Sequence, residues 1–473
     1  MLQSKKWISI LLMAFITVCL FNMNLTRVFS ATNQIKGLNW AAPGDNFQSG
    51  VIYPSGLSSS DTYSSAYTTA STLIGAMYSL TGANTVRMPI NESTVSGWWS
   101  VYTGVIDAAL TKGKVILCYW AVSNGKPASI TNFYNMWTTV VNKYGSNSNC
   151  YFEPINEPYG YSSSDLNNLY YTWITTYPGV SQSRVILDGS KYAQVPSTVG
   201  ADSRLSGCLL GYHEYLFFNA QSSESAWLSH IQSDIGSYAS RTVCTEFGAV
   251  MNTGLLDGKT QYNSLLNYDD PNGSDTFIPY IRAITSQFRV WNMGSVYWPG
   301  CRDGDIYRLC TKSGSGSGIA MAINNTSGLK RIQYAWGNSI TVTAKIKNVA
   351  TGLFIDGMGR TSNGSNAGQY AGGTSTNQSW VINPSGGNYT ILDVATGLYL
   401  DGMGRTSSGS ICGQYASSSS NNQLWTIETS GNNVKFKNVA TGLYLDSAGA
   451  TSNGADLKQY SSSSSANQQW QIQ

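Results

Sequence analysis

The chain has 473 residues, more than one ordinary domain needs, and only 11% of them are charged. With 12% aromatic residues it is globular rather than disordered. Of its 28 basic residues, Lys5, Lys6 and Arg27 lie in the first 31 residues, which hold no acid, and 25 acidic residues follow. The remainder is therefore electrically neutral, which argues against a nucleic-acid partner or an anionic lipid surface.

The N-terminus carries an apolar run that follows Lys5 and Lys6 and ends at the small residues Ser30 and Ala31. This pattern is typical of a secretory signal peptide. A membrane anchor is the alternative, but the run is short for a membrane span. We therefore expect residues 1–31 to be a signal peptide, and the mature chain to be secreted, extracellular and without a membrane contact.

Residues 32–340 alternate between short apolar or β-branched runs and helix-like stretches such as 98–113 and 225–240. The strand-like runs are 35–40, 84–90, 114–120, 150–156, 184–189, 207–215, 241–249 and 293–300. Eight strands that alternate with helices predict an α/β domain, a (β/α)8 TIM barrel. A doubly wound open sheet is the alternative, but no glycine-rich phosphate turn follows the first run.

In such a barrel the working residues lie at the C-terminal ends of the strands. These ends carry Trp40, Arg87, Trp120, Asn156, Glu157, His213, Tyr215, Glu246 and Trp298. Glu157 and Glu246 fall on the expected fourth and seventh strands, across the barrel mouth from each other. Two facing carboxylates suit a retaining glycosidase, in which one donates a proton and the other attacks. Arg87 is expected to lower one pKa, and burial to raise the other.

Other side chains of this region have simpler interpretations. Glu153 is expected to be a buried hydrogen-bonding group, because it lies inside a strand. For Trp40 and Trp98, core packing and sugar stacking are equally compatible with the sequence. Tyr159 and Tyr161 follow the fourth strand on a loop and could line a sugar subsite.

Five motifs occur in barrel order: "VRMPI" around Arg87, "NEP" at 156–158, "HEY" at 213–215, "TEFG" at 245–248 and "VYWPG" around Trp298. Together they resemble glycoside hydrolase family 5, in the cellulase-like clan of retaining barrel glycosidases. The resemblance extends over residues 35–337.

The resemblance implies that Glu157 is the acid/base and Glu246 the nucleophile. It implies substrate-binding or orienting roles for Arg87, Asn156, His213, Tyr215 and Trp298. Asn156 would bond to the sugar 2-hydroxyl, and Tyr215 and Arg87 would orient Glu246. His213 would bind sugar or lie beside the acid/base, and Trp298 would stack on a sugar ring.

The implied activity is that of an O-glycosyl hydrolase acting on a polysaccharide or oligosaccharide, endo-glucanase-like or a related β-glycanase, without a cofactor. The third strand of that family often ends with a histidine, whereas this one ends with Tyr119 and Trp120. The sugar and its linkage therefore stay open. Two alternatives share the same residues: a secreted carbohydrate-binding protein with an inactive barrel, and a transglycosylase.

Residues 341–473 contain three copies of one pattern, with Asp356, Asp401 and Asp446 at equal spacing. Short strands broken by Gly, Ser and Asn turns predict an all-β domain whose copies must pack together. The triplets "QSW", "QLW" and "QQW" resemble the ricin B-type β-trefoil, carbohydrate-binding module family 13. The resemblance implies up to three sugar pockets, formed by Asp356, Tyr370 and Asn377; Asp401, Tyr415 and Asn422; and Asp446, Tyr460 and Asn467. The alternative is a scaffold without working pockets.

The cysteines and histidines exclude several classes of site. Seven cysteines remain beyond the signal peptide, so at least one thiol is unpaired. A disulfide between Cys301 and Cys310, which flank a polar loop, is the best pairing. The two histidines, His213 and His230, are too few for the usual zinc ligand set, so no metal is expected. The mature chain is expected to be a monomer.

Overall fold

The computed structural model describes residues 32–44, 48–121 and 125–473. The expected signal peptide, residues 1–31, lies outside the described residues. No helix in the described ranges combines the length and the apolar character that crossing a bilayer requires.

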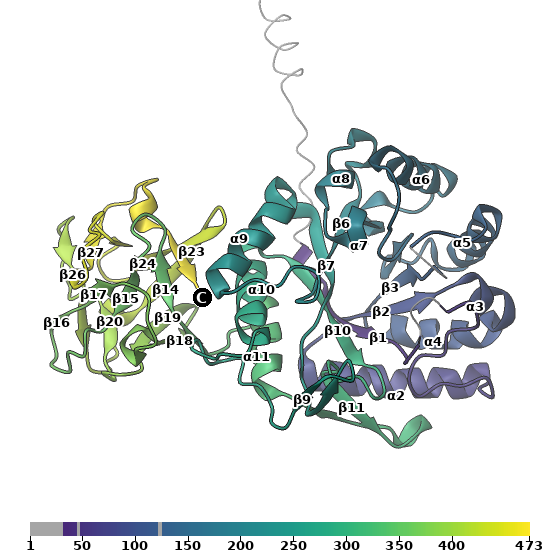
Figure 1. The fold of residues 1–473 in the computed structure, drawn as a ribbon, viewed down its shortest axis with the longest axis horizontal. Coiled ribbons are helices and arrows are strands. Elements are labelled where there is room, and N and C mark those ends of the chain that lie inside the picture. Colours follow the sequence, from purple (N-terminus) through teal and green to yellow (C-terminus); the bar gives the residue numbers. More distant parts are fainter. Residues whose placement is uncertain (1–31, 45–47, 122–124) are drawn as a thin grey trace, which may run out of the picture. The chain divides into compact units, whose positions relative to one another are not determined.

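Eight parallel strands form the N-terminal sheet (Figure 1), in the spatial order β4-β3-β2-β1-β10-β7-β6-β5. A parallel bridge between Phe152 and Val185 joins β4 to the start of β5 and closes the ring. The predicted (β/α)8 barrel is therefore confirmed. The strands are β1 Lys36–Trp40, β2 Thr85–Ile90, β3 Lys114–Tyr119, β4 Cys150–Glu153, β5 Ile186–Asp188, β6 Leu209–Glu214, β7 Thr242–Phe247 and β10 Gly294–Cys301.

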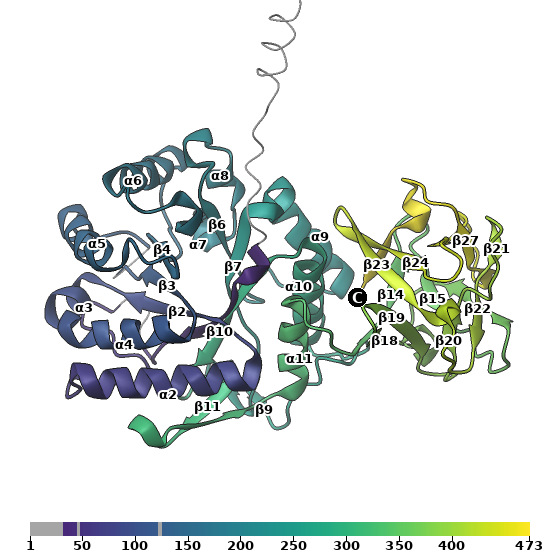
Figure 2. The ribbon, with the colours of Figure 1, turned by 180° about the vertical axis from the view of Figure 1, so that it is seen from behind.

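Helices cover the outside of this sheet, and α2 packs along α4 (Figure 2). The stretches 98–113 and 225–240 contain α4 and α9 as predicted, although α9 stops at Ile235, where Gly236 turns the chain with a φ of 53°. The helices are α2 Tyr63–Thr81, α3 Glu92–Gly97, α4 Trp99–Lys112, α5 Ile130–Tyr144, α6 Ser163–Thr176, α7 Ser190–Ala193, α8 Ser197–Gly200, α9 Glu224–Ile235, α10 Phe277–Trp291 and α11 Thr326–Ala335.

The longest helix, α2, shows how local sequence sets these boundaries. Thr62 and Ser65 form a capping box, in which each side chain accepts a hydrogen bond from the backbone N–H of the other. At the other end Gly82 adopts a left-handed φ of 76° and donates its N–H to the Tyr78 carbonyl. The apolar face between these caps is buried against the barrel wall.

Two hairpins extend the barrel loops, β8 Gly254–Leu256 with β9 Thr260–Tyr262 and β11 Cys310–Ser313 with β12 Ala320–Ile323. The predicted disulfide is wrong for this structure, because Cys301 and Cys310 are both free, buried thiols. Noncovalent bonds hold their loop instead. The Leu309 N–H donates to the Pro299 carbonyl at 2.9 Å, and Arg302 pairs with Asp305 at 2.8 Å.

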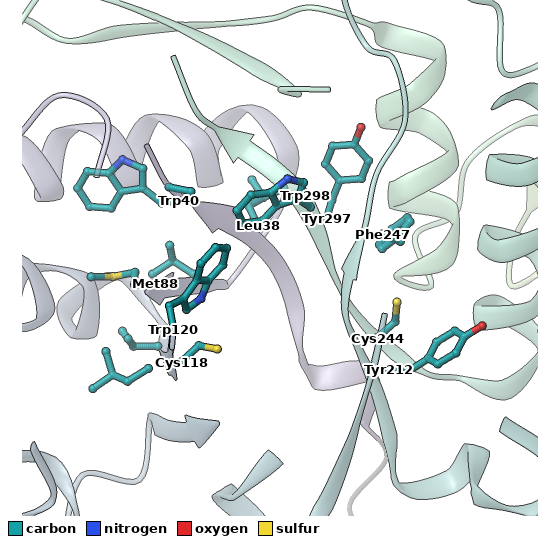
Figure 3. Packing of buried hydrophobic residues seen from close by; sticks show 14 of the residues in the cluster. Leu38, Trp40, Met88, Cys118, Trp120, Tyr212, Cys244, Phe247, Tyr297 and Trp298 are labelled. Carbon is teal, nitrogen blue, oxygen red and sulfur yellow. The ribbon is translucent and has the colours of Figure 1, made fainter. Parts of the chain in front are cut away.

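Apolar and aromatic side chains fill the barrel interior and its contacts with the helices (Figure 3). Trp40 is fully buried, and its indole N–H donates to the Ser55 carbonyl at 3.0 Å. Trp98 is also buried and contacts Tyr53 edge-on, with 4.8 Å between ring centroids. The structure thus decides the open alternative for both tryptophans in favour of core packing.

The C-terminal domain is antiparallel and all-β, consistent with the predicted trefoil, and has a hydrophobic core of its own. The expected boundary at 340/341 falls between α11 and β13. The strands are β13 Val342–Ala344, β14 Ile346–Asn348, β15 Phe354–Asp356, β16 Ser365–Asn366, β17 Gly368–Tyr370, β18 Trp380–Ser385, β19 Asn388–Asp393, β20 Tyr399–Asp401, β21 Ser410–Ile411, β22 Gly413–Tyr415, β23 Trp425–Ser430, β24 Asn433–Asn438, β25 Tyr444–Asp446, β26 Ala455–Asp456, β27 Lys458–Tyr460 and β28 Trp470–Ile472.

The three sequence repeats fold alike. Their equivalent strand pairs share one register, which places Phe354 opposite Tyr370, Tyr399 opposite Tyr415 and Tyr444 opposite Tyr460. In each repeat a buried tryptophan donates its indole N–H to a strand carbonyl at 3.0 to 3.1 Å; these are Trp380, Trp425 and Trp470. The Gln-x-Trp tryptophans therefore belong to the core.

One position breaks the threefold repetition. Asn348 and Asn438 each accept backbone N–H groups through Oδ1 and donate Nδ2 to a carbonyl, at 2.8 and 2.7 Å. The equivalent Asp393 also accepts two backbone N–H groups, but its second oxygen is buried without a partner. An ionised carboxylate cannot donate to the equivalent carbonyl, that of Asn377. Burial accordingly raises the pKa of Asp393 to about 6.

We expect Asp393→Asn to stabilise the trefoil, because an amide restores the missing donor. The raised pKa means that ionising Asp393 disfavours the folded state. The contribution of Asp393 to the free energy of unfolding therefore falls as pH rises from about 4 to 6. The gain in free energy of unfolding should be absent near pH 4 and reach about 2 kcal/mol above pH 7. Urea unfolding of the full chain at both pH values measures this gain.

The reverse change is the matched control. Asn438→Asp should create the same defect and lower stability at pH 7 while leaving stability at pH 4 nearly unchanged. An Asp393→Asn gain of equal size at both pH values would contradict the assignment.

Candidate functional site

The predicted site residues come together at the C-terminal mouth of the barrel. Arg87 comes from β2, Glu246 from β7 and His213 from β6. Tyr215 directly follows β6, and Asn156 and Glu157 lie three and four residues after the end of β4. Parallel strands that start at one rim end at the other, so their last residues converge from distant parts of the sequence.

Arg87 is the centre of the cluster and is almost fully buried. Its guanidinium donates to both carboxylate oxygens of Glu153, at 2.6 and 2.8 Å. It also donates to Glu246 Oε1 and to Asn156 Oδ1. A further bond runs to Asn39 Oδ1 at 2.9 Å. The planar fork of five donors thus holds side chains from β1, β4 and β7 in one layer.

Glu157 and Glu246 approach each other closely, with His213 between them. One carboxylate oxygen of each glutamate lies within 4.8 Å of the other and of a His213 ring nitrogen. His213 Nδ1 is 3.0 Å from Glu157 Oε1 and 3.8 Å from Glu246 Oε2. The Tyr215 hydroxyl donates to Glu246 Oε2 at 2.8 Å.

The two glutamates differ in environment. Burial raises the pKa of Glu157 to about 7, against an opposing effect of Arg87. Burial also raises the pKa of Glu246 above its usual range, while His213 and Arg87 act to lower it. The expectation that Arg87 would bring one pKa below normal is met at Glu153 instead, where burial is outweighed by the Arg87 pair. Burial lowers the pKa of His213 to about 4, so its ring is neutral near pH 7.

Trp298 ends its strand beside Trp120, and the two indole rings stack with centroids 5.5 Å apart (Figure 3). Both rings are largely buried, at 8% and 4% exposed. They form one apolar surface between the ends of β10 and β3. Trp298 therefore remains a candidate for stacking on a sugar, and Trp120 supports it.

Two features were absent from the predicted site. Asp188 ends β5 and accepts the Glu157 backbone N–H at 2.9 Å. Tyr192, Phe217 and Phe218 lie on the loops after β5 and β6 and form ring contacts that reach Tyr159. Reading every strand end would have found Asp188, which directly follows the run "VIL". The ring contacts have no signal in the sequence, because they join separate loops.

The trefoil positions also repeat in space. Asp356, Asp401 and Asp446 are buried, and each accepts the backbone N–H of the residue two positions later, at 2.6 to 2.7 Å. Tyr370 and Tyr415 are exposed at 42% and 41%, while Tyr460 is partly buried. Asn377, Asn422 and Asn467 each lie against a glycine turn after the aspartate. The three sets thus share one local arrangement, and their role as sugar pockets stays a prediction.

Replacing Arg87 tests how far the cluster depends on it. Arg87→Met leaves the Glu153 and Glu246 carboxylates buried without their cation, which should lower the free energy of unfolding by about 3–5 kcal/mol. Denaturant unfolding of the full chain measures the loss.

Arg204→Met is the matched control, because its pair with Asp202 is solvent-exposed. It should leave the unfolding midpoint nearly unchanged. Equal losses of unfolding free energy for the two substitutions would show that the buried pairing contributes no more to stability than the Arg204 pair does.

Several solved structures are similar to a part of this chain. The designed threefold-symmetric protein ThreeFoil is 31% identical, with a TM-score of 0.27, over 28% of this chain and 96% of its own. An exo-beta-1,3-galactanase from Clostridium thermocellum is 24% identical, with a TM-score of 0.27, over 33% of this chain and 32% of its own. A ricin B-like lectin from Macrolepiota procera, in complex with lactose, is 25% identical, with a TM-score of 0.24, over 28% of this chain and 93% of its own. The curated proteins gave no match.

Two protein families match the chain. Residues 332–415 and 421–473 match the ricin-type beta-trefoil lectin domain-like family. Residues 45–295, more than half of the chain, match the cellulase family, glycosyl hydrolase family 5. This chain therefore belongs to glycosyl hydrolase family 5 and is a glycoside hydrolase with a ricin-type carbohydrate-binding module.

Proposed function

We propose that the protein is a secreted, retaining glycoside hydrolase that cleaves β-linked polysaccharide, with Glu157 as acid/base and Glu246 as nucleophile. The observation that carries this proposal is that one carboxylate oxygen of Glu157 lies within 4.8 Å of one carboxylate oxygen of Glu246. Retaining enzymes hold their two carboxyl groups about 5–5.5 Å apart, whereas inverting enzymes need about 6.5–9.5 Å to admit a water molecule.

In the first step an oxygen of Glu246 attacks the anomeric carbon, and the bond from that carbon to the glycosidic oxygen breaks. The proton of Glu157 passes to the departing oxygen, so the leaving chain departs as an alcohol. A pKa near 7 supports this role, because Glu157 is then largely protonated in mildly acidic solution. Arg87 and the Tyr215 hydroxyl each donate one hydrogen bond to Glu246, and both bonds favour its anionic form.

In the second step Glu157, now ionised, takes a proton from water. The water oxygen attacks the anomeric carbon, and the ester bond to Glu246 breaks. Two inversions give net retention, and both carboxyl groups return to their starting protonation states. The neutral ring of His213, 3.0 Å from Glu157, can orient this carboxyl group in either state.

The trefoil and the N-terminus support two further parts of the proposal. A ricin-type module that repeats a buried aspartate and an aromatic side chain three times supports attachment to the same polysaccharide, which raises the local substrate concentration. The apolar run after Lys5 and Lys6 supports secretion. An endo-acting β-glycanase is the specific activity that we favour, since the barrel and its module would both act on long chains.

Glu246→Ala should reduce hydrolysis by roughly 10⁴-fold, because no oxygen remains to form the ester. A panel of β-glucan, mannan, xylan and galactan, with product sizing, first identifies the substrate for wild-type protein. NMR of the initial product anomer should show retention, and a 2-fluoroglycoside of that sugar should label Glu246.

Glu428→Ala, a glutamate of β23 in the trefoil, is the control for the substitution itself and should hydrolyse the substrate normally. Near-normal turnover by Glu246→Ala, or an inverted first product, would overturn the proposal.

A further inference from the structure

Four aromatic side chains form a continuous surface at the barrel mouth, which we call the aromatic shelf: Tyr159, Tyr192, Phe217 and Phe218. Tyr159 and Tyr192 stack with centroids 4.5 Å apart, and Tyr192 and Phe218 lie at 6.0 Å. Phe217 contacts Phe218 edge-on at 4.8 Å. The rings come from the loops after β4, β5 and β6, so three separate loops present one surface.

The shelf is partly open to solvent. Phe217 is 62% exposed and Tyr159 is 44% exposed. Exposed aromatic surfaces of this kind on soluble proteins mark binding sites more often than isolated apolar side chains do. The shelf is also held in place at a conformational cost, as the loop after β5 shows.

This loop contains the short segment α7, whose backbone is not that of a regular helix. Within it Lys191, Tyr192 and Ala193 are consecutive non-glycine residues with φ values of 55°, 59° and 62°. Left-handed backbone is unfavourable for such residues and persists where surrounding contacts enforce it. Hydrogen bonds from Val195 to the Ser190 carbonyl and from Tyr192 to the Pro158 carbonyl enforce it here. The strained turn brings the Tyr192 ring onto Tyr159.

The Tyr159 end of the shelf adjoins the acid/base. Tyr159 lies two residues after Glu157, and Tyr192 stacks on Tyr159 and donates its N–H to the carbonyl of Pro158, the residue after Glu157. At the other end Phe217 stacks on Tyr215 at 4.8 Å, and Tyr215 donates to Glu246. A chain that leaves the glutamates along Tyr159 and Tyr192 therefore passes Glu157, which gives its proton to the departing oxygen.

The geometry points to the aromatic shelf as a binding site for the sugar units on the leaving-group side of the cleaved bond. This inference rests on the proposed function and adds to it a specific subsite. The apolar faces of neutral sugar rings match exposed aromatic rings, while their hydroxyl groups stay in water.

Phe217→Ala and Tyr192→Ala test the shelf. Each variant is assayed with two substrates built from the sugar that wild-type protein cleaves: the polysaccharide and the glycosyl fluoride. A fluoride leaving group cannot reach the shelf. We expect kcat/KM for the polysaccharide to fall about three- to tenfold for each variant, mainly through KM. The glycosyl fluoride should be hydrolysed at the wild-type rate, and Phe217→Trp should retain activity on the polysaccharide.

Tyr171→Ala, an aromatic residue of α6 that is 40% exposed, is the matched control and should change neither rate. Equal losses on both substrates, or no loss on either, would overturn the inference that the shelf binds the leaving-group sugars. A change in molecular mass by light scattering with unchanged turnover would assign the shelf to a contact between copies. Failure of wild-type protein to cleave either substrate would instead refute the proposed function.

A different observation concerns Asp188, whose carboxyl group is buried directly beneath Glu157. Asp188 Oδ2 accepts the Glu157 backbone N–H at 2.9 Å. Glu157 itself has a φ of 48°, which is unfavourable for a residue with a side chain. The Asp188 bond therefore fixes the one peptide whose conformation sets the direction of the Glu157 side chain.

The surrounding strands are built to admit this carboxyl group. A Cβ atom on Gly211 of β6 would lie 1.9 Å from Asp188 Oδ1, so only glycine fits there. The Tyr170 hydroxyl of α6 donates to the Asp188 carbonyl at 2.9 Å. Oxygens of Glu153 and Asp188 and a nitrogen of His213 lie within 4.8 Å of one another. Burial and the Glu153 charge raise the pKa of Asp188 well above its usual range.

We infer that Asp188 is a positioning residue, which holds the left-handed peptide of Glu157 and thereby aims the acid/base at the departing oxygen. This inference rests on the proposed function but not on the aromatic shelf. The other ionisable groups around Glu157 are Arg87 from β2, Glu153 from β4, His213 from β6, Glu246 from β7, and Tyr192 and Tyr215 after β5 and β6.

Asp188→Ala removes the acceptor and Asp188→Asn keeps one in the same shape. For a sugar leaving group, which needs a proton, we expect kcat/KM of Asp188→Ala to fall about tenfold or more. For the glycosyl fluoride, whose departing ion needs little proton transfer, kcat/KM covers only the steps up to departure of fluoride and should stay near the wild-type value. Asp188→Asn should restore kcat/KM for the sugar leaving group. Its activity should also fall above pH about 7, as the Glu157 pKa predicts for wild-type protein.

Tyr170→Phe is the matched control, since it loosens the same strand end without touching the Glu157 N–H. It should preserve the wild-type ratio of the two rates. Equal losses on both substrates for Asp188→Ala would indicate a merely structural role, and unchanged rates would exclude positioning; either result overturns the inference. An inactive wild-type protein would again refute the proposed function alone.

Discussion

The pairing of buried Arg87 with Glu153 and Glu246 is the interaction on which the barrel site depends. A guanidinium without water must have charged partners and must satisfy its donors, and Arg87 does so with side chains from three other strands. The hydrogen bonds that stabilise the buried cation therefore also fix the relative positions of the strand ends at the barrel mouth. Glu153 acts as a permanent counter-ion, which leaves Glu246 free to change its bonding.

The charge balance of this layer determines the state of its other acids. One cation faces two carboxylates, so further negative charge beneath the mouth is costly. Burial raises the pKa of Glu157 to about 7, raises the pKa of Asp188 well above its usual range and lowers the pKa of His213 to about 4. The ring of His213 is therefore neutral near pH 7, and Glu157 holds a proton in mildly acidic solution. Burial, together with one excess carboxylate, accounts for these shifts.

In the trefoil, the three repeats are constrained by the core that they share. Three copies of one pattern share strand register and tryptophan hydrogen bonds, because each copy must fill one third of a common core. The equivalent of Asn348 and Asn438 is Asp393, which lacks their donor and leaves one buried oxygen without a partner. A repeat fold tolerates one such defect, since the other bonds of that turn remain.

The sequence by itself determined the barrel, the repeats and the strand ends that bring Arg87, Glu157 and Glu246 together, since alternation and spacing are local signals of strands and turns. It also indicated Glu153 as buried support. Only the tertiary structure decided that Trp40 and Trp98 belong to the core, that Cys301 and Cys310 stay unbonded, and that Asp188 and the aromatic shelf adjoin the glutamates. These outcomes depend on distances between residues far apart in the chain, which closure of the barrel sets and no local pattern records.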